Sequence, residues 1–542
     1  MRRLGRLLKG GEPFIWLTGS ALAFSLLMVA GLLFLILRNG LGFFWPADLW
    51  VFTLDDGSRI GGRIAAREAI PEPGAKGPVR LKYRLKVKEG NRDVTGADFV
   101  WVDEAKIVKR ERPADLVAFE RREWGDFYGW VKAVKDGEKV VAEGHGPAYR
   151  ALLADLPKAR EVRDEARRIE KDDIGSVNYA KEKLRLELKK LELHGVTSGP
   201  AVSKLKARED ALTATYDELV KRLDEVRSRL TATVVLETVD GKEKEVPVTQ
   251  VLRADRPNEM GLLAKAGRYL GGVWSFVSED PRESNTEGGV FPAIFGTVLM
   301  VMIMSLVVTP LGVLTAFYLR EYAVQGPVVS AVRIAVNNLA GVPSIVFGVF
   351  GLGFFVYFIG GSLDRLFFAE SLPTPTWGTG GILWASLTLS LLTVPVVIVA
   401  AEEGLAAIPR GMREASLALG ATKFETMWRV VLPAVMPSIL TGLILAMARA
   451  AGEVAPLMIT GVVKLAPALP VDGYPPFLHF DRKFMHLGFH IFDVGFQSPN
   501  VDAARPMVYN TTVLLLVIVV ALNLTAIVIR NRLRKKLRTS GI

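Results

Sequence analysis

The chain has 542 residues, of which 50% are hydrophobic and 23% charged, and its formal net charge is +11 at pH 7. Because it contains no cysteine, disulfide bonds are excluded as a source of stability. No Gly-x-x-x-x-Gly-Lys-Ser/Thr loop occurs, which excludes ATP binding by that motif.

The apolar residues are segregated into long runs. A bilayer core about 30 Å thick requires roughly 20 helical residues, and each run is long enough to cross it. The alternative, buried helices of a large soluble domain, fits poorly, because such helices rarely run this far without a charged residue. The sequence predicts a mainly α membrane protein with six transmembrane helices, at about 14–37, 290–318, 328–360, 379–401, 437–459 and 508–529.

Basic residues flank the first and last spans, and such residues stay on the cytoplasmic side of a membrane. We therefore expect both termini in the bacterial cytoplasm and residues 38–289 in the periplasm. Residues 1–37 are interpreted as a cytoplasmic N-terminus with a retained first span, which is too long for a secretory signal. The tail, residues 530–542, is interpreted as a topology signal or a contact with anionic membrane lipid rather than a nucleic-acid site. The basic residues are Arg2, Arg3, Arg6, Lys9, Arg530, Arg532, Arg534, Lys535, Lys536 and Arg538.

The periplasmic insert begins with strand-like runs. Leu81 to Lys88 alternates apolar and basic residues, as in a half-buried strand. Asp-Gly pairs between such runs indicate hairpins, and they occur at 56–57, 136–137 and 240–241. Because the third pair lies far downstream, we expect a helical stretch inserted into one small β module, formed by residues 47–146 and 231–256.

The helical stretch, residues 147–230, carries a heptad pattern. Eight of nine seam positions are apolar, as a coiled coil requires: Val202, Leu205, Glu209, Leu212, Tyr216, Leu219, Leu223, Val226 and Leu230. An earlier helix, at about 151–193, shows a similar seam with a phase slip after Ile169. Gly195 to Pro200 separates the two helices, so the pattern predicts an antiparallel coiled-coil hairpin. The hairpin is either an arm that contacts a binding protein or a second permease, or a spacer without contacts.

A charged loop, residues 402–436, is predicted between the fourth and fifth spans, on the cytoplasmic side. It contains Glu414-Ala415-Ser416, then three residues, Gly420, nine residues, and Val430-Val431-Leu432-Pro433. This spacing resembles the coupling-loop signature of bacterial ABC importer permeases, with Ser for Ala and Val for Ile. The resemblance implies that a short helix here docks on an ATPase, and Gly420 allows a turn or a close approach. The alternative is an ordinary amphipathic loop.

Two further segments narrow the resemblance, namely Asn337 to Gly348 and Arg449 to Leu457. The second reads Arg-Ala-Ala-Gly-Glu-Val-Ala-Pro-Leu, with Val454 where Thr is usual. From Val290 onward the chain resembles the PstA-type permease subunit of bacterial phosphate ABC importers, a type I ABC importer permease. The core is expected at 290–529, with five helices, and the insert lies outside the resemblance.

Arg449 and Glu453 are the charged residues expected inside the fifth span, where charge is costly and marks a pathway or an ion pair. Spaced four apart on a helix, they can simply pair with each other. Alternatively, the planar guanidinium binds phosphate oxygens, and the carboxylate accepts the proton that phosphate carries near neutral pH. Asn337 and Asn338 are further pathway candidates, or helix caps. Pro343 and its neighbouring glycines weaken the third span as a continuous helix, which serves either a cavity or close helix packing.

The resemblance implies a non-enzymatic permease subunit of an ATP-driven phosphate importer. Its expected partners are two copies of an ATP-binding subunit that hydrolyses ATP, a second permease of the PstC type, a periplasmic phosphate-binding protein and inorganic phosphate. No cofactor is expected. A metal site at His479, His486 and His490 is less expected than a folded or interfacial loop. The alternatives are an importer of another oxyanion, such as sulfate or molybdate, and a membrane-anchored coiled-coil scaffold.

Overall fold

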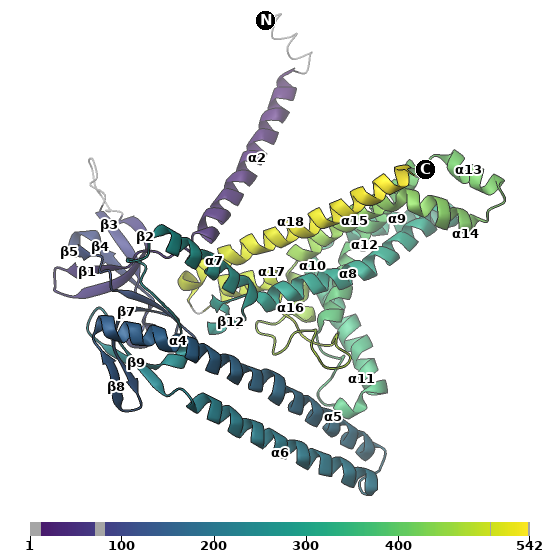
Figure 1. Ribbon diagram of the computed structural model, residues 1–542. Helices are drawn as coiled ribbons and strands as arrows, with labels where there is room; N and C mark the ends of the chain where they lie inside the picture. Colours follow the sequence, from purple (N-terminus) through teal and green to yellow (C-terminus); the bar gives the residue numbers. More distant parts are fainter. Residues whose placement is uncertain (1–11, 71–81, 499, 540–542) are drawn as a thin grey trace, which may run out of the picture. The chain divides into compact units, whose positions relative to one another are not determined.

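The computed structural model describes residues 12–70, 82–498 and 500–539 and consists of two compact units (Figure 1). The helical unit contains residues 1–43, 290–362 and 377–542, and the α/β unit contains residues 44–289 and 363–376. The basic residues Arg2, Arg3, Arg6 and Lys9, on which the cytoplasmic placement of the N-terminus partly rests, lie outside the described residues.

Six helices within the described residues are long and apolar enough to cross a membrane, which confirms the six predicted spans. Several are composites of α-helix and short π-helical turns (η). In chain order the spans are formed by α2 (Glu12–Leu41); α8 (Phe291–Phe317) with η5 (Tyr318–Tyr322); α10 (Ser344–Phe350) with η6 (Gly351–Gly360) and α11 (Gly361–Phe367); α12 (Ile382–Ala407); α14 (Lys423–Thr426) with η8 (Met427–Val431) and α15 (Leu432–Gly452); and α18 (Val501–Thr539).

The core of the helical unit lies where α8, α12 and α15 pack together. Met300 and Met304 from α8, Leu389 from α12 and Ala446 from α15 belong to one buried cluster. Small residues allow the close approach that membrane helices use. A Cβ on Gly442 of α15 would lie 2.5 Å from the Cβ of Ala400, so only glycine fits there. α18 packs on both α15 and α2.

Two of the predicted apolar runs extend across a helix break and are not single helices. The run 328–360 is not one helix, because α9 (Pro327–Leu339) ends before a turn and Pro343 caps the start of α10. The run 437–459 is likewise divided: α15 ends at Gly452 and α16 (Ala455–Thr460) follows. In both cases a proline one turn ahead lacks the N–H that would continue the helix and clashes with the preceding turn.

The connections of the helical unit carry the remaining short elements. The segment between the fourth and fifth spans is shorter than the predicted loop 402–436, because α12 continues to Ala407 and α14 begins at Lys423. Between them lies α13 (Arg410–Ala418), and the connection between the fifth and sixth spans contains α17 (Leu487–Phe492) and η9 (Asp493–Gln497). The predicted basic tail begins inside α18 rather than after it.

Two larger antiparallel sheets and the two-stranded pair β12-β13 form the β part of the α/β unit. The first has the order β4-β3-β2-β1-β5 and the second the order β10-β9-β7-β6-β11, with β8 paired to β7. The strands are β1 (Trp50–Leu54), β2 (Arg59–Ile70), β3 (Lys82–Lys88), β4 (Phe99–Asp103), β5 (Ile107–Glu111), β6 (Val117–Arg121), β7 (Asp126–Asp136), β8 (Lys139–Glu143), β9 (Ala232–Glu237), β10 (Glu243–Pro247) and β11 (Val251–Asp255). The unit also contains several short elements. They are the helix α3 (Arg92–Thr95), four 3-10 helices, η1 (Glu104–Lys106), η3 (Val248–Gln250), η4 (Glu283–Asn285) and η7 (Ala369–Ser371), and the strands β12 (Pro281–Arg282) and β13 (Glu287–Gly288).

The local strand predictions hold. All three Asp-Gly pairs turn antiparallel hairpins, joining β1 to β2, β7 to β8 and β9 to β10. Gly57, Gly137 and Gly241 each have a positive φ, which these turns require and glycine adopts freely. The helical stretch is inserted between β8 and β9, both of which pair with β7.

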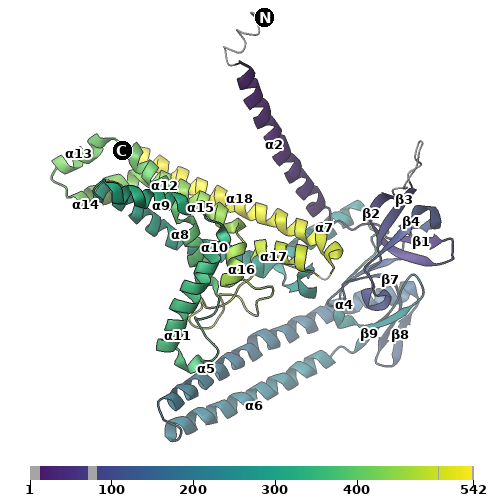
Figure 2. The same ribbon diagram turned by 180° about the vertical axis from the view of Figure 1, so that it is seen from behind.

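The inserted helices form an antiparallel pair in which α5 runs beside α6 in both views (Figures 1 and 2). They are α4 (His145–Arg168), the π-helical turn η2 (Ile169–Asp173), α5 (Ile174–Leu193) and α6 (Pro200–Ser228). All nine predicted seam positions of the second helix are buried or half-buried. The predicted phase slip coincides with η2, because a π-turn adds one residue to the helix and rotates the seam.

Candidate functional site

Arg449 and Glu453 lie at the end of the fifth span. Arg449 is in the last turn of α15, whereas Glu453 has left the helix and is extended, with φ −77° and ψ 134°. Their side chains pair through one contact of 3.5 Å between Nε and Oε1, and they are 35% and 21% exposed. The expected ion pair is therefore present, although the residues do not share a continuous helix. Because the contact is long and the Arg449 side chain is partly exposed, the guanidinium can still bind an anion.

The breaks in the third and fifth spans are neighbours. α10 and α16, the helices that begin after the breaks, pack against each other. A Cβ on Gly348 of α10 would lie 2.7 Å from the Cα of Pro456, so glycine permits this contact. Gly351 similarly approaches Thr388 of α12. These glycines therefore serve close helix packing, one of the two roles considered for them.

Asn337 and Asn338 lie in the last turn of α9, just before the first break, and both are exposed. Leu339 and Val342, on either side of the break, pack on the buried cluster that contains Ala450 and Ala451. The chain therefore holds the asparagine turn against the same core as the end of α15. No contact brings the asparagine side chains to Arg449 in the described structure.

The segment that carries the coupling signature is a helix, a tight turn and a second helix start. Glu414 and Ala415 are exposed on α13, and Gly420 turns the chain with φ +88°. Nothing lies within 4 Å of a Cβ built on Gly420, so the turn needs glycine for its backbone conformation and not for space. Thr422 and Glu425 form a capping box at the start of α14. Leu432 and Pro433 open α15 and are half-buried.

Charged side chains tie this turn to the end of the second span. Arg413 of α13 pairs with Glu321 of η5 at 3.0 Å and donates to the carbonyl of Leu405 at 2.8 Å. Lys423 donates to the carbonyl of Glu321 and lies over the ring of Tyr322, 4.7 Å from its centroid. The sequence marked Arg413 and Lys423 only as charges that make the loop polar. Their partner Glu321 is about one hundred residues away, and no local pattern indicates it.

A second tie, also missed from the sequence, joins α9 to α12. Arg333 pairs with Glu402 at 3.1 Å and donates to the carbonyl of Leu319 at 3.1 Å. The second span, α9 and the fourth span are thus linked at one level by a single guanidinium. The first tie therefore holds α13 against the second and fourth spans, and the second tie holds α9 against the same two spans.

Large apolar side chains are exposed around the turn. Leu417 and Leu419 project from the end of α13, and Leu419 is 89% exposed. Phe424 and Trp428 stack on each other, with ring centroids 6.3 Å apart, and both remain exposed. We call Leu417, Leu419, Phe424 and Trp428 the apolar turn surface. Exposed apolar patches beside a charged helix are typical of protein–protein contacts.

The three histidines between the fifth and sixth spans do not converge. His479 pairs with Asp472 at 2.9 Å, and the His490 ring lies 3.3 Å from the hydroxyl of Thr511. Burial lowers the pKa of His486 to about 3, and its Nδ1 accepts a hydrogen bond from the N–H of Gly488 at the start of α17. Among the described residues no group of three or more metal-binding side chains is present.

Comparison with known proteins places this arrangement among transporters. The sequence profile of the family described as "Binding-protein-dependent transport system inner membrane component" matches residues 308–539. The chain is 31% identical to the "Probable ABC transporter permease protein YqgI" of Bacillus subtilis over 255 residues, which cover 46% of this chain and 80% of that protein.

A second relative is the "Phosphate transport system permease protein PstA 1" of Mycobacterium tuberculosis. It is 35% identical over 188 residues, which cover 35% of this chain and 56% of that protein, so the chain spans little more than half of its length. Among solved structures, an inward-facing MetNI methionine ABC transporter aligns with a TM-score of 0.33 and 19% identity, covering 48% of this chain and 96% of that chain.

Proposed function

The chain belongs to the family of binding-protein-dependent transport system inner membrane components, the ABC transporter permeases, and we propose that it is a permease subunit of an ATP-driven phosphate importer. The observation that carries the choice of phosphate is the 35% identity to a phosphate transport permease over 188 residues. Within this proposal the chain forms part of the path for inorganic phosphate through the inner membrane.

Arg449 supplies the cation of that path. A guanidinium donates two parallel hydrogen bonds to phosphate oxygens, and it binds more strongly away from bulk water. Glu453 holds Arg449 through one long contact, so an incoming anion competes with a weak partner. The carboxylate can also accept the proton of hydrogen phosphate, whereas sulfate carries none at neutral pH. This pair would therefore favour phosphate. Asn337 and Asn338 would line the same path.

The apolar turn surface and α13 form the contact with the ATPase. ATP binding would draw two ATPase subunits together, and α13 would pass that movement to the second and fourth spans through Arg413 and Lys423. We place a second permease of the PstC type beside this chain and a phosphate-binding protein outside it. The exposure of Glu414 and Ala415 on α13 supports the docking role.

Uptake of radiolabelled phosphate tests this function. Cells that lack the chain should lose high-affinity uptake under phosphate limitation, and the wild-type chain should restore it. Excess unlabelled arsenate, a close analogue, should compete, whereas sulfate and molybdate should not. Competition by sulfate or molybdate would identify another oxyanion importer. Intact phosphate uptake without the chain would favour the scaffold alternative.

The proposed orientation has a separate test, because the native chain contains no cysteine. Ser198 lies in the exposed turn of the helical hairpin, and Leu419 lies in the exposed turn after α13. In intact spheroplasts an impermeant thiol reagent should label Ser198→Cys and leave Leu419→Cys unlabelled until the membrane is opened. The opposite pattern would reverse the orientation proposed here for residues 38–289.

A further inference from the structure

The helix α7 (Leu262–Ser278) presents an apolar face outward. The side chains of Leu262, Leu263, Leu270 and Trp274 are 78%, 91%, 67% and 71% exposed. The other exposed positions of the helix are Ala264, Gly267, Gly271 and Ser278. None of these residues is charged. A helix on the surface of a soluble domain has the opposite arrangement, with charges outward.

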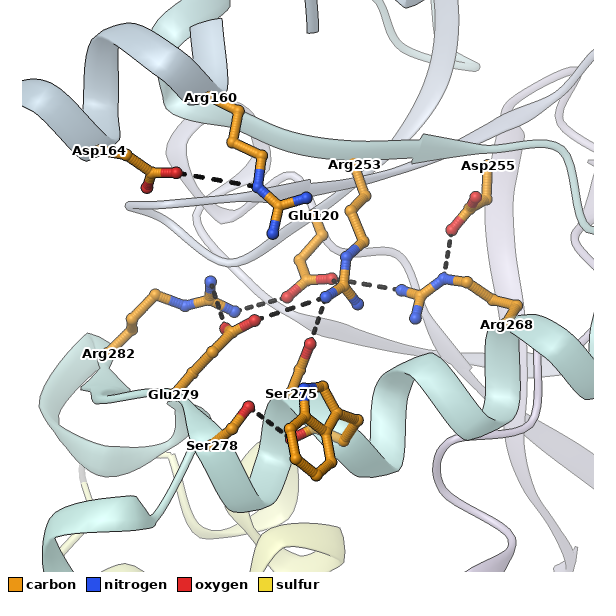
Figure 3. Close-up of polar contacts among 11 residues, drawn as sticks. Glu120, Arg160, Asp164, Arg253, Asp255, Arg268, Ser275, Ser278, Glu279 and Arg282 are labelled. Atoms are coloured by element: carbon orange, nitrogen blue, oxygen red, sulfur yellow. Dashed lines mark hydrogen bonds and ion pairs between the residues drawn. The ribbon is translucent and has the colours of Figure 1, made fainter. Parts of the chain in front are cut away.

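The charged residues of α7 face inward instead, where each has a partner. Lys265 pairs with Asp48 at 2.7 Å, and Arg268 pairs with Asp255 at 2.6 Å and with Glu120 at 3.3 Å. Figure 3 shows Arg268 and Ser275 directed from the helix toward Glu120 and Arg253. Arg282 and Glu279 complete this network on the far side of Glu120. The polar face of α7 therefore packs against the rest of the α/β unit, and the exposed face of the helix is apolar.

The covalent chain fixes how far α7 can lie from the membrane. The first span ends at Leu41, and Phe44 follows three residues later, which is a reach of at most about 11 Å. The ring of Phe44 lies 5.4 Å from that of Phe276 and 6.3 Å from that of Tyr269, both on α7. Trp45 also contacts Tyr269, at 6.2 Å. α7 is thus bound to the chain just where it leaves the bilayer.

We propose that α7 lies flat on the outer leaflet and inserts Leu263, Leu270 and Trp274 between lipid headgroups. The headgroup layer is several Å deep on each side of the hydrocarbon core, within reach of a helix tethered in this way. An apolar stripe with tryptophan and tyrosine suits that layer, where aromatic rings gather. The α/β unit contributes the charges that hold the other face of the helix, so insertion leaves no charge unpaired. The surface would rest the α/β unit on the membrane.

Fluorescent labels on single cysteines test the occupant of this face in the full-length chain, reconstituted in phosphatidylcholine nanodiscs. Leu270→Cys and Leu263→Cys place a polarity-sensitive dye on the exposed face, where it disturbs no packing. The matched control is Leu193→Cys, a leucine that is 55% exposed near the tip of the helical hairpin. Each sample is quenched either by lipid that carries a nitroxide near its headgroup or by aqueous iodide.

The dyes on α7 should show blue-shifted emission, lose most of their fluorescence to the nitroxide lipid and resist quenching by iodide. The dye at Leu193→Cys should show no blue shift, should be quenched by iodide and should resist quenching by the nitroxide lipid. Quenching of the α7 dyes by iodide alone would place the face in water and overturn the proposal. Resistance to both quenchers would mean that protein covers the face, and it would overturn the proposal in favour of a partner subunit. The result does not depend on which substrate is transported.

Discussion

Two arginine–carboxylate pairs, one in each unit, differ in almost every respect. In the α/β unit, Arg121 and Asp93 are 2% and 3% exposed and share two hydrogen bonds of 2.9 Å. The remaining donors of Arg121 meet the carbonyls of Gly125 and Trp124. In the helical unit, Arg449 and Glu453 are partly exposed and meet through a single contact of 3.5 Å. The hydrogen-bonding groups of the first pair are therefore largely occupied, which we call a saturated pair, whereas those of the second pair are not.

The difference separates structural charges from charges available for binding. Burial alone would raise the pKa of Asp93, but the hydrogen bonds and charge of Arg121 hold it below its usual value, so the carboxylate stays ionised as part of the fold. A saturated pair offers no donor to a ligand. Arg449 makes only one long contact with its partner, which lies in extended backbone after the end of the helix. Under the proposed function, the first pair supports the fold and the second meets phosphate.

The largest expected effect is on the saturated pair. Arg121→Met should destabilise the α/β unit by about 3–5 kcal/mol, because it leaves Asp93 charged and buried with only a 3.7 Å contact to Lys244. The measurement is the temperature at which a protease begins to cut residues 44–289 in the full-length chain. The double variant Arg121→Met with Asp93→Leu should regain most of the loss, since no buried charge is then left alone. A double variant as unstable as the single one would contradict a simple structural pair.

The unsaturated pair should behave in the opposite way. Arg449→Gln should lower phosphate uptake about 10-fold to 100-fold, the loss of one charge-assisted hydrogen bond worth about 1.5–3 kcal/mol, with assembly unchanged. Arg449→Lys should retain part of the activity, because it keeps the charge but not the planar fork. The double variant Arg449→Gln with Glu453→Gln should stay as impaired as the single variant. If it transported phosphate at the wild-type rate, Arg449 would be a structural partner like Arg121.

Local patterns predicted much of both units. Alternation and Asp-Gly pairs gave the hairpins, and the heptads gave the buried face of α6, because these features depend on residues a few positions apart. Even the π-turn η2 was visible as a phase slip after Ile169. In the helical unit, hydropathy gave the number of spans among the described residues, and fixed spacings indicated the segment around Gly420.

Features that depend on distant partners were not predicted. The sequence analysis made no prediction for α7, because the partners of its inward charges, Asp48, Glu120 and Asp255, lie on other elements. The division of the strands into two sheets is set by pairings such as β1 with β5, far apart in sequence. Hydropathy also extended the third and fifth spans through their breaks, since a proline and its neighbours remain apolar.

The turn at Gly420 gives a smaller effect. Gly420→Ala should strain the turn by about 1–2 kcal/mol, because a Cβ disfavours the left-handed conformation. Co-purification of the ATPase and uptake should both fall. Gly411→Ala is the matched control: this glycine lies inside α13, also in open space and without a positive φ, so alanine should support the helix. Equal behaviour of the two variants would show that the turn conformation does not matter for docking.

The smallest expected effect is the pH dependence that a partly buried carboxyl group, Glu89, gives to the stability of the α/β unit. Burial, with repulsion from Asp240, raises the pKa of Glu89 from 4.5 to about 7. Between these values the unfolded chain releases the proton while the folded unit keeps it, so stability falls as pH rises through this window and levels off above about pH 7.

Glu89→Gln should flatten that decline and raise the melting temperature by a few degrees above about pH 7, with little change below about pH 4.5. Glu138→Gln, at an exposed turn between β7 and β8, is the control and should leave the profile unchanged. A decline of the same size in Glu89→Gln would assign the pH dependence to other groups, first to Glu287, whose pKa is also raised to about 7 by burial.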